Sequence, residues 1–71
     1  MIVESDYRGY RIEVAAFKTE GAWDADVTIR QTLSATTACA GHVTCRRLTA
    51  HAAEESGAMC ARQWVDRHGR S

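Results

Sequence analysis

Within the nine-residue run 23–31, apolar and polar residues alternate without interruption from Trp23 to Arg30. This period of two is typical of a β-strand with one face on a core and the other in water. The residues predicted to point inward are Trp23, Ala25, Val27 and Ile29. A half-buried strand needs neighbouring strands and a cover for its apolar face, so the run indicates a sheet packed against another layer.

A second alternating run, 10–17, predicts a strand whose inward residues are Tyr10, Ile12, Val14 and Ala16. The polar, glycine-bearing segment 18–22 that joins the two runs has the length of a hairpin connection. The two strands are therefore expected to pair antiparallel.

The segment 32–41 is rich in threonine, serine and alanine and is predicted to be a flexible loop. A shorter third strand is expected over 42–48, with Val43 and Cys45 inward. The adjacent Arg46 and Arg47 break its alternation, which favours a position at the edge of the sheet.

Capping signals at both ends predict a helix in the remaining segment of the chain. Thr49 is a favourable N-cap, Leu48 before it is expected to pack on Ala53, and Gly69 is placed to end the helix. The predicted buried stripe consists of Ala53, Gly57, Cys60, Ala61 and Trp64. A glycine inside a helix costs about 1 kcal/mol relative to alanine. Gly57 therefore predicts a close approach to the sheet, beside the Trp23 ring.

These elements predict an α+β fold in the order β-β-β-α, a three-stranded antiparallel meander with one C-terminal helix packed on one face. The chain is expected to form a single domain over 1–71, in which 1–6 is either disordered or an extra edge strand. A chain of 71 residues buries only about 60% of its unfolded surface. Such a small two-layer domain favours dimerisation through a sheet edge or the helix.

Three stretches resemble a family of small stand-alone bacterial domains of unknown function. They are Tyr7-Arg8-Gly9-Tyr10 with Ile12 and Val14; Gly21 with Trp23, Ala25, Val27 and Ile29; and Ala61-Arg62-Gln63-Trp64-Val65-Asp66. The resemblance implies a β-meander covered by one C-terminal helix. It implies no activity or ligand, and the cysteine- and arginine-rich third strand departs from the family pattern.

Charge and composition narrow the classes of function. Nine basic and nine acidic residues cancel, whereas nucleic-acid-binding domains usually carry a basic excess. The N-terminus lacks a signal-peptide layout, and no apolar run approaches the ~20 residues that cross a bilayer. With three cysteines in no disulfide spacing, we expect a cytoplasmic protein without a membrane partner.

Thiol and imidazole groups form the first candidate chemistry. Cys39, His42 and Cys45 have zinc-ligand side chains, with His51 and Cys60 elsewhere. On a strand, however, His42 and Cys45 would lie on opposite faces. Cys45 and Cys60 are therefore expected to be small core residues and Cys39 a loop thiol, with no metal or other cofactor.

A catalytic cysteine is the second candidate. Cys39 precedes His42 by three residues, but no orienting carboxylate or oxyanion-hole element stands nearby in the sequence. We therefore expect no catalytic residues and no enzymatic activity.

Nucleic acid is the third candidate ligand. Arg11, Arg30 and Arg46 are predicted to lie on the open sheet face, but acidic residues are mixed among them, namely Glu13, Asp24 and Asp26. The start of the helix, 50–55, also carries Glu54 and Glu55, where a domain that grips phosphates would need lysines. Cross-strand charge pairing is the favoured interpretation. The three arginines are nevertheless the best candidates for binding residues.

The aromatic residues favour packing over binding. Trp23 and Trp64 are expected to pack on each other or on Gly57, whereas Tyr7 and Phe17 flank a strand and are better placed for a partner. By elimination, the sequence predicts a small non-enzymatic interaction module that acts through a protein partner or as a homo-oligomer. The alternatives are a nucleic-acid-binding module that uses the open sheet face and a small metal- or thiol-dependent protein.

Overall fold

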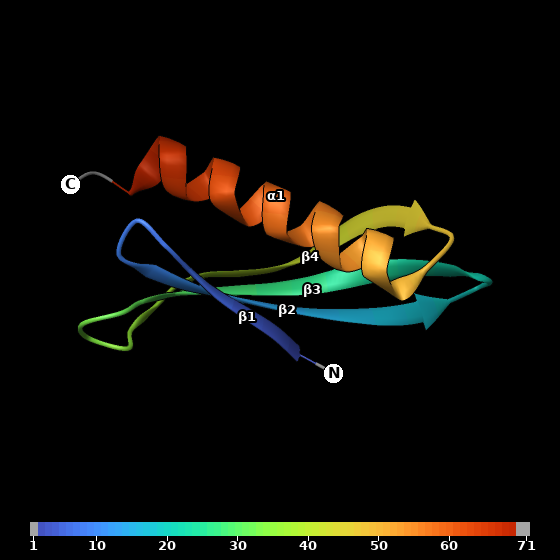
Figure 1. The fold of residues 1–71 in the computed structure, drawn as a ribbon, viewed down its shortest axis with the longest axis horizontal. Helices are drawn as coiled ribbons and strands as arrows, with labels where there is room; N and C mark the ends of the chain where they lie inside the picture. Colours follow the sequence, from blue (N-terminus) through green and yellow to red (C-terminus); the bar gives the residue numbers. More distant parts are fainter. Residues whose placement is uncertain (1, 70–71) are drawn as a thin grey trace.

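A computed structural model describes residues 2–69. They form four strands and one helix: β1 (Ile2–Tyr7), β2 (Tyr10–Thr19), β3 (Ala22–Gln31), β4 (Thr37–Arg47) and α1 (Ala50–His68). The strands form one antiparallel sheet in the order β1-β2-β3-β4, and α1 crosses one face of it (Figure 1). The α+β class and the C-terminal helix are confirmed, but the predicted count of three strands is wrong.

The additional strand is β1, which occupies most of the segment 1–6 that was expected to be disordered or an edge strand; Met1 lies outside the described residues. β1 pairs with β2 so that Val3 faces Val14 and Tyr7 faces Tyr10. Every β1 residue except Tyr7 is exposed. No buried face therefore imposes an apolar alternation on its sequence, which explains why it was not assigned as a strand.

Two tight turns connect the first three strands. Arg8 and Gly9 have φ values of 50° and 85°, and Glu20 and Gly21 have values of 50° and 81°. Positive φ at both central residues is the requirement of the two-residue turn that matches the twist of a hairpin. The connection expected over 18–22 is therefore shorter, and both neighbouring strands extend into it.

The fourth strand begins at Thr37, five residues before the predicted start at 42 and inside the expected loop 32–41. The connection is the five-residue segment 32–36, closed by a hydrogen bond from the Gln31 N–H to the Thr36 carbonyl at 2.9 Å. Side-chain size explains the error. The early part of β4 carries small residues, so pairing with β3, as between Ile29 and Cys39, leaves little trace in its hydropathy.

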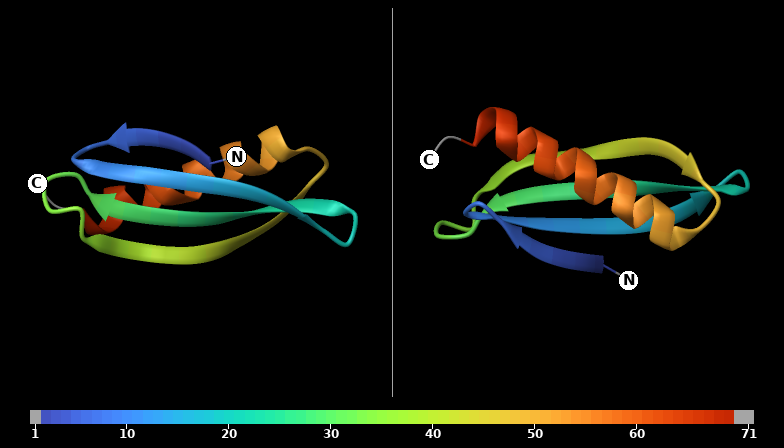
Figure 2. Two further views of the ribbon diagram at one scale, coloured as in Figure 1. Left: turned by 90° about the horizontal axis from the view of Figure 1, so that it is seen from below. Right: turned by 45° about the horizontal axis from the view of Figure 1, so that its top comes forward.

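The core lies between α1 and the central strands β2 and β3. Its fully buried sheet residues include Ile12, Val14, Ala25 and Ile29. The helix contributes a stripe at every fourth position: Ala53, Gly57, Ala61 and Val65. Figure 2 shows α1 running obliquely across the sheet, with β1 and β4 at the two outer edges.

Two residues of the predicted helix stripe behave differently from expectation. Cys60 is exposed rather than buried, and Trp64 is half-buried at the margin of the core. The buried stripe instead continues from Ala61 to Val65, which is fully buried and was not predicted, so the helix is turned away from the side that carries Cys60. Trp23 is half-buried outside the main core cluster, and its expected packing on Trp64 or Gly57 is not found.

Gly57 marks the close approach of helix and sheet that the sequence predicts. A Cβ atom built on Gly57 would lie 2.9 Å from Val14 Cγ1 and 3.0 Å from Ala25 Cβ. Both distances are shorter than normal van der Waals contact between carbon atoms. The absence of a side chain at this position therefore sets the spacing between α1 and the sheet.

The ends of α1 largely follow the sequence signals. The Thr49 side chain accepts a hydrogen bond from the Ala52 N–H at 3.1 Å, and the Gly69 N–H donates to the Val65 carbonyl at 2.7 Å. Leu48 is 90% exposed, so its expected packing on Ala53 is wrong. Within residues 2–69, no helix has the length and apolar character needed to cross a membrane.

Candidate functional site

The three arginines predicted as binding residues do not form one patch. Arg11 and Arg30 are direct cross-strand partners on β2 and β3, on the face turned away from α1. Arg46 lies near the opposite end of β3, next to the register pair of Trp23 and Arg47. At about 3.3 Å per strand residue, some 20 Å of β3 separates it from Arg30.

Each of these arginines already has a polar partner. Arg11 Nε lies 3.1 Å from Asp6 Oδ1, and Arg30 Nε lies 3.5 Å from Glu13 Oε1. The Arg46 side chain reaches across β3 and donates to the Thr19 carbonyl at 3.5 Å. The cross-strand charge pairing expected from the sequence is confirmed for Arg11 and Arg30.

Carboxylates surround these arginines on the open face. The strand register places five there: Glu4, Asp6, Glu13, Asp24 and Asp26. A polyanion bound at this face would have to displace the existing ion pairs and approach the remaining carboxylates. The geometry therefore gives no support to phosphate binding by the open face.

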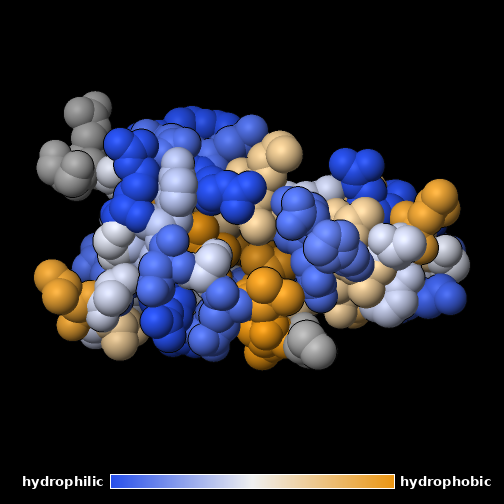
Figure 3. Space-filling view, viewed as in Figure 1, coloured by the Kyte–Doolittle hydropathy of each residue, from blue (hydrophilic) through white to orange (hydrophobic). Residues whose placement is uncertain are grey.

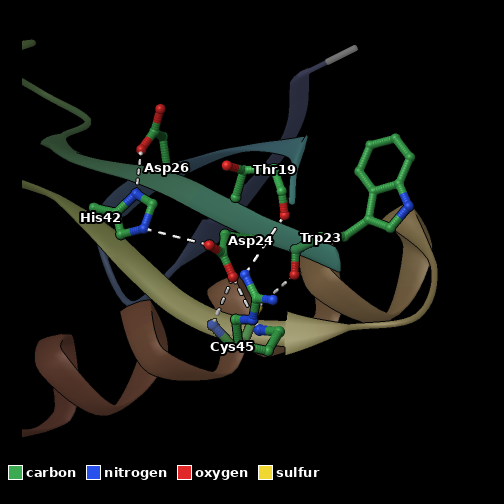
Figure 4. A network of polar contacts seen from close by, with 7 residues as sticks. Thr19, Trp23, Asp24, Asp26, His42 and Cys45 are labelled. Atoms are coloured by element: carbon green, nitrogen blue, oxygen red, sulfur yellow. Dashed lines mark hydrogen bonds and ion pairs between the residues drawn. The ribbon is translucent and has the colours of Figure 1, made fainter. Parts of the chain in front are cut away.

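A polar network occupies the β3–β4 part of the open face (Figure 4). His42 lies between two carboxylates: its Nδ1 is 3.3 Å from Asp26 Oδ1, and its Nε2 is 3.6 Å from Asp24 Oδ2. The Phe17 ring packs beside the imidazole, with ring centroids 5.2 Å apart. Because both ring nitrogens face a carboxylate, neither is directed at a nucleophile, and the network does not have the geometry of a catalytic triad.

Asp24 holds an irregular segment of β4 in place. Between the register pairs of Trp23 with Arg47 and Ala25 with Val43, one residue of β3 faces three residues of β4. The Asp24 carboxylate accepts hydrogen bonds from the N–H groups of Cys45 and Arg46, at 3.1 and 2.9 Å. It thereby satisfies donors that the bulge removes from the regular ladder.

Burial and charge at Asp24 have opposing effects. The residue is only 3% exposed, and burial alone would raise the pKa of its carboxyl group. The hydrogen bond from the Arg46 N–H is the largest influence and lowers that pKa, aided by the Cys45 N–H and the charges of His42 and Arg46. Asp24 is therefore held as a carboxylate at neutral pH, which is the form that accepts these bonds.

The cysteine and histidine side chains of the described residues do not cluster at one place. Cys39 and Cys45 are half-buried on β4, Cys60 is exposed on α1, and the Cys45 thiol points to the Trp23 carbonyl at 3.5 Å. Among residues 2–69, no group of three or more cysteine, histidine or carboxylate side chains has the arrangement of a metal site. The prediction that Cys60 is a core residue is wrong, as is the placement of Cys39 in a loop.

An apolar groove runs between α1 and β4 on the helix side of the sheet. Its volume is about 160 Å³, and its lining includes Cys39, Gly41 and Val43 from β4 and Cys60 and Trp64 from α1. The groove exists because α1 lies over the central strands and leaves the inner face of β4 only partly covered. Cys39 and Val43, on that face, are half-buried.

Trp64 forms one wall of this groove and belongs to an aromatic cluster. Its ring meets Tyr10 edge-on, with centroids 6.2 Å apart, and stacks on His68 at 4.6 Å. Tyr7, which the sequence favoured for a partner, instead donates from its hydroxyl group to Asp66 on α1 at 2.9 Å. Trp64 is therefore a better candidate contact residue than Tyr7.

The outer edge of β4 adjoins the groove. No Asp, Glu, Lys or Arg occurs from Thr37 to Cys45. Within residues 2–69, β4 pairs only with β3, so its other side presents unpaired backbone groups. This edge was not predicted because the segment 32–41 was expected to be a loop, although the uncharged run contains Thr37, Val43 and Thr44, which favour an extended strand.

No protein-family model, curated protein or solved structure matches this chain. Its resemblance to the small bacterial domain family therefore stays a prediction, and its function must be argued from its own geometry.

Proposed function

We propose that this chain is a small non-enzymatic interaction module that binds protein through the edge of β4 and the adjoining α1–β4 groove. The observation that carries the proposal is the uncharged, unpaired β4 edge next to an apolar groove. An extended segment that pairs with a sheet edge gains main-chain hydrogen bonds, and side-chain pockets beside the edge provide selectivity.

The residues considered for nucleic-acid binding and for metal or thiol chemistry already have partners or lie apart. The open-face arginines are engaged with Asp6, Glu13 and the Thr19 carbonyl. His42 is engaged with two carboxylates, and the thiols lie on separate elements. The β4 edge, in contrast, combines free backbone groups with an apolar surface.

Affinity capture with a tagged full chain tests the proposal. The variant Ala40→Lys introduces a charge at the β4 edge, where the side chain of Ala40 is exposed and faces away from α1. Ser5→Lys introduces the same charge at the exposed β1 edge and serves as the matched control. We expect bound protein, including untagged copies of the chain itself, to be lost with Ala40→Lys and retained with Ser5→Lys. Equal capture by both variants would contradict the proposal.

A further inference from the structure

We propose that the partner at the β4 edge is a second copy of this chain, paired antiparallel about a two-fold axis at Gly41. This inference rests on the proposed function and specifies its partner. It follows from the shape of β4, the charge along the edge and the difference between the two edges of the sheet.

The shape of β4 determines the register. An irregularity at Ala38 interrupts the ladder at one end, and the bulge at residues 44–46 interrupts it at the other. The regular stretch between them is 39–43, with Gly41 at its centre. Only the register that places Gly41 opposite Gly41 pairs the whole of this stretch with its copy, so that Cys39 faces Val43 twice.

This register also keeps side chains on matching faces. Cys39, Gly41 and Val43 are register partners of the buried residues Ile29, Val27 and Ala25, and so lie on the helix side in both copies. Paired strands share faces only when the register is preserved, because a shift of one residue would exchange the two faces. The two-fold axis would then stand perpendicular to an eight-stranded sheet, with both helices on the same side.

Charge permits this pairing. The formal net charge of the chain is zero at neutral pH, so two copies do not repel each other as whole molecules. The paired stretch 39–43 contains no Asp, Glu, Lys or Arg, so no like charges of these residues face one another across the axis. Charge therefore does not oppose the pairing of this stretch with its own copy.

The groove supplies the apolar contribution. Val43 and Cys39 of one copy would lie beside Cys39 and Val43 of the other and would extend the apolar floor that ends at the β4 edge in a single copy. Trp64 stands at the side of this floor. Burial of half-exposed apolar side chains would add to the backbone hydrogen bonds of a five-residue stretch.

The opposite edge of the sheet is less suitable. β1 is only six residues long and carries Glu4 and Asp6, whereas β4 has eleven residues. Ile2 and Val3 are exposed and give the start of β1 an apolar surface, and the space-filling view shows apolar side chains exposed over this side of the sheet (Figure 3). Glu4 and Asp6 place charged side chains along this short strand, and charge on an edge strand disfavours pairing with another chain.

Sedimentation velocity on the full chain, from about 1 µM to about 1 mM, tests the association over the range of weak complexes. We expect the mass to rise from 7.8 kDa towards twice that value. Ala40→Lys and Ala40→Glu should each weaken association at least about tenfold, and an equimolar mixture of the two should restore it. Ser5→Lys should associate as the unsubstituted chain does.

The register has its own test. In a Cys60→Ser background, Val43→Cys would place a thiol opposite Cys39 of the other copy, at a cross-strand spacing that suits a disulfide. Mild oxidation should then give a covalent dimer from this variant and none from Cys60→Ser alone. This measurement does not depend on how well the lysine variant folds.

The outcomes separate the dimer from the wider proposal. A mass of 7.8 kDa at every concentration would overturn the dimer, and capture of a different protein that Ala40→Lys prevents would still support the interaction module. Association that persists in both Ala40 variants, or that Ser5→Lys abolishes, would overturn the β4 pairing. Failure of Val43→Cys to cross-link while the chain is dimeric would overturn the Gly41 register.

Discussion

The Asp24 carboxylate and the backbone N–H of Arg46 lie 2.9 Å apart, joining a buried position of β3 to the bulge of β4. The same oxygen accepts from the Cys45 N–H. Arg46 itself has a φ of 51°, a conformation that non-glycine residues seldom adopt. The buried carboxylate therefore stabilises a local geometry that the backbone alone would not favour.

Substitution of Asp24 should loosen this bulge. Asp24→Ala removes the acceptor from two N–H groups, whereas Asp24→Asn keeps an acceptor oxygen and loses only the charge. We therefore expect stability to decrease in the order wild type, Asp24→Asn, Asp24→Ala, as measured by chemical denaturation. Amide hydrogen exchange at Cys45 and Arg46 should accelerate most in Asp24→Ala, and unchanged exchange there would show that the carboxylate does not hold the bulge.

Acid should destabilise the fold through two carboxylates. Hydrogen bonds from the Arg46 N–H lower the pKa of Asp24, and those from Arg8, followed by Tyr7, lower the pKa of Asp66. A folded pKa below the unfolded value of about 3.9 contributes stability above that pH and loses it as pH falls through the folded pKa. The thermal midpoint of unfolding should therefore depend little on these two carboxylates near neutral pH and should fall below about pH 4.

Asp66→Asn isolates the second carboxylate. It should lower the thermal midpoint at neutral pH and show a smaller further loss below about pH 4 than the unsubstituted chain. Thr49→Ala is the matched control because it removes the N-cap, at a cost of about 1 kcal/mol, without removing a titrating group. Identical pH profiles for Asp66→Asn and the unsubstituted chain would contradict the assignment.

Gly57→Ala should destabilise the protein although alanine is the better helix former. The gain in helix propensity is about 1 kcal/mol, whereas overpacking of a tight interface costs about 1–3 kcal/mol. The new methyl group would meet Val14 Cγ1 and Ala25 Cβ, and neither of these short side chains can easily move aside. We expect a net loss of up to about 2 kcal/mol in urea denaturation. A gain in stability would contradict the close approach of α1 and the sheet at Gly57.

Thiol accessibility should distinguish the three cysteines. Cys60 is exposed, whereas Cys39 and Cys45 are half-buried. Alkylation of the native chain, followed by mass spectrometry of its peptides, should therefore modify Cys60 first. If β4 pairs with a second copy, modification of Cys39 should slow as the protein concentration rises. Fastest modification of Cys45 would contradict the described packing.

The predictability of the fold depended on how strongly each strand is buried. β2 and β3 carry the core residues Val14 and Val27 at alternate positions, and their hydropathy revealed them. β1 and the first half of β4 are edge segments, so burial selects few of their residues. The helix could be predicted from Thr49 and Gly69. Its orientation on the sheet depends on packing around Gly57, so the exposure of Cys60 could not be predicted.

The candidate interaction surface was harder to predict than the fold. Placing Cys39 and Trp64 on one groove requires the relative position of β4 and α1, which no local pattern encodes. The network of Asp24 and His42 likewise depends on the β3–β4 register and its bulge. The pairing of Arg11 and Arg30 with carboxylates, in contrast, could be anticipated from alternating charges on neighbouring strands.

The acidic residues of β1 would determine where assembly stops. Once two chains joined through β4, both outermost strands would be β1, each short and bearing Glu4 and Asp6. A third chain would meet a short strand with charged side chains at either side, which opposes growth into an open fibre. Because charge protects the β1 edge and not the β4 edge, the sheet favours a finite two-chain complex over unlimited edge-to-edge growth.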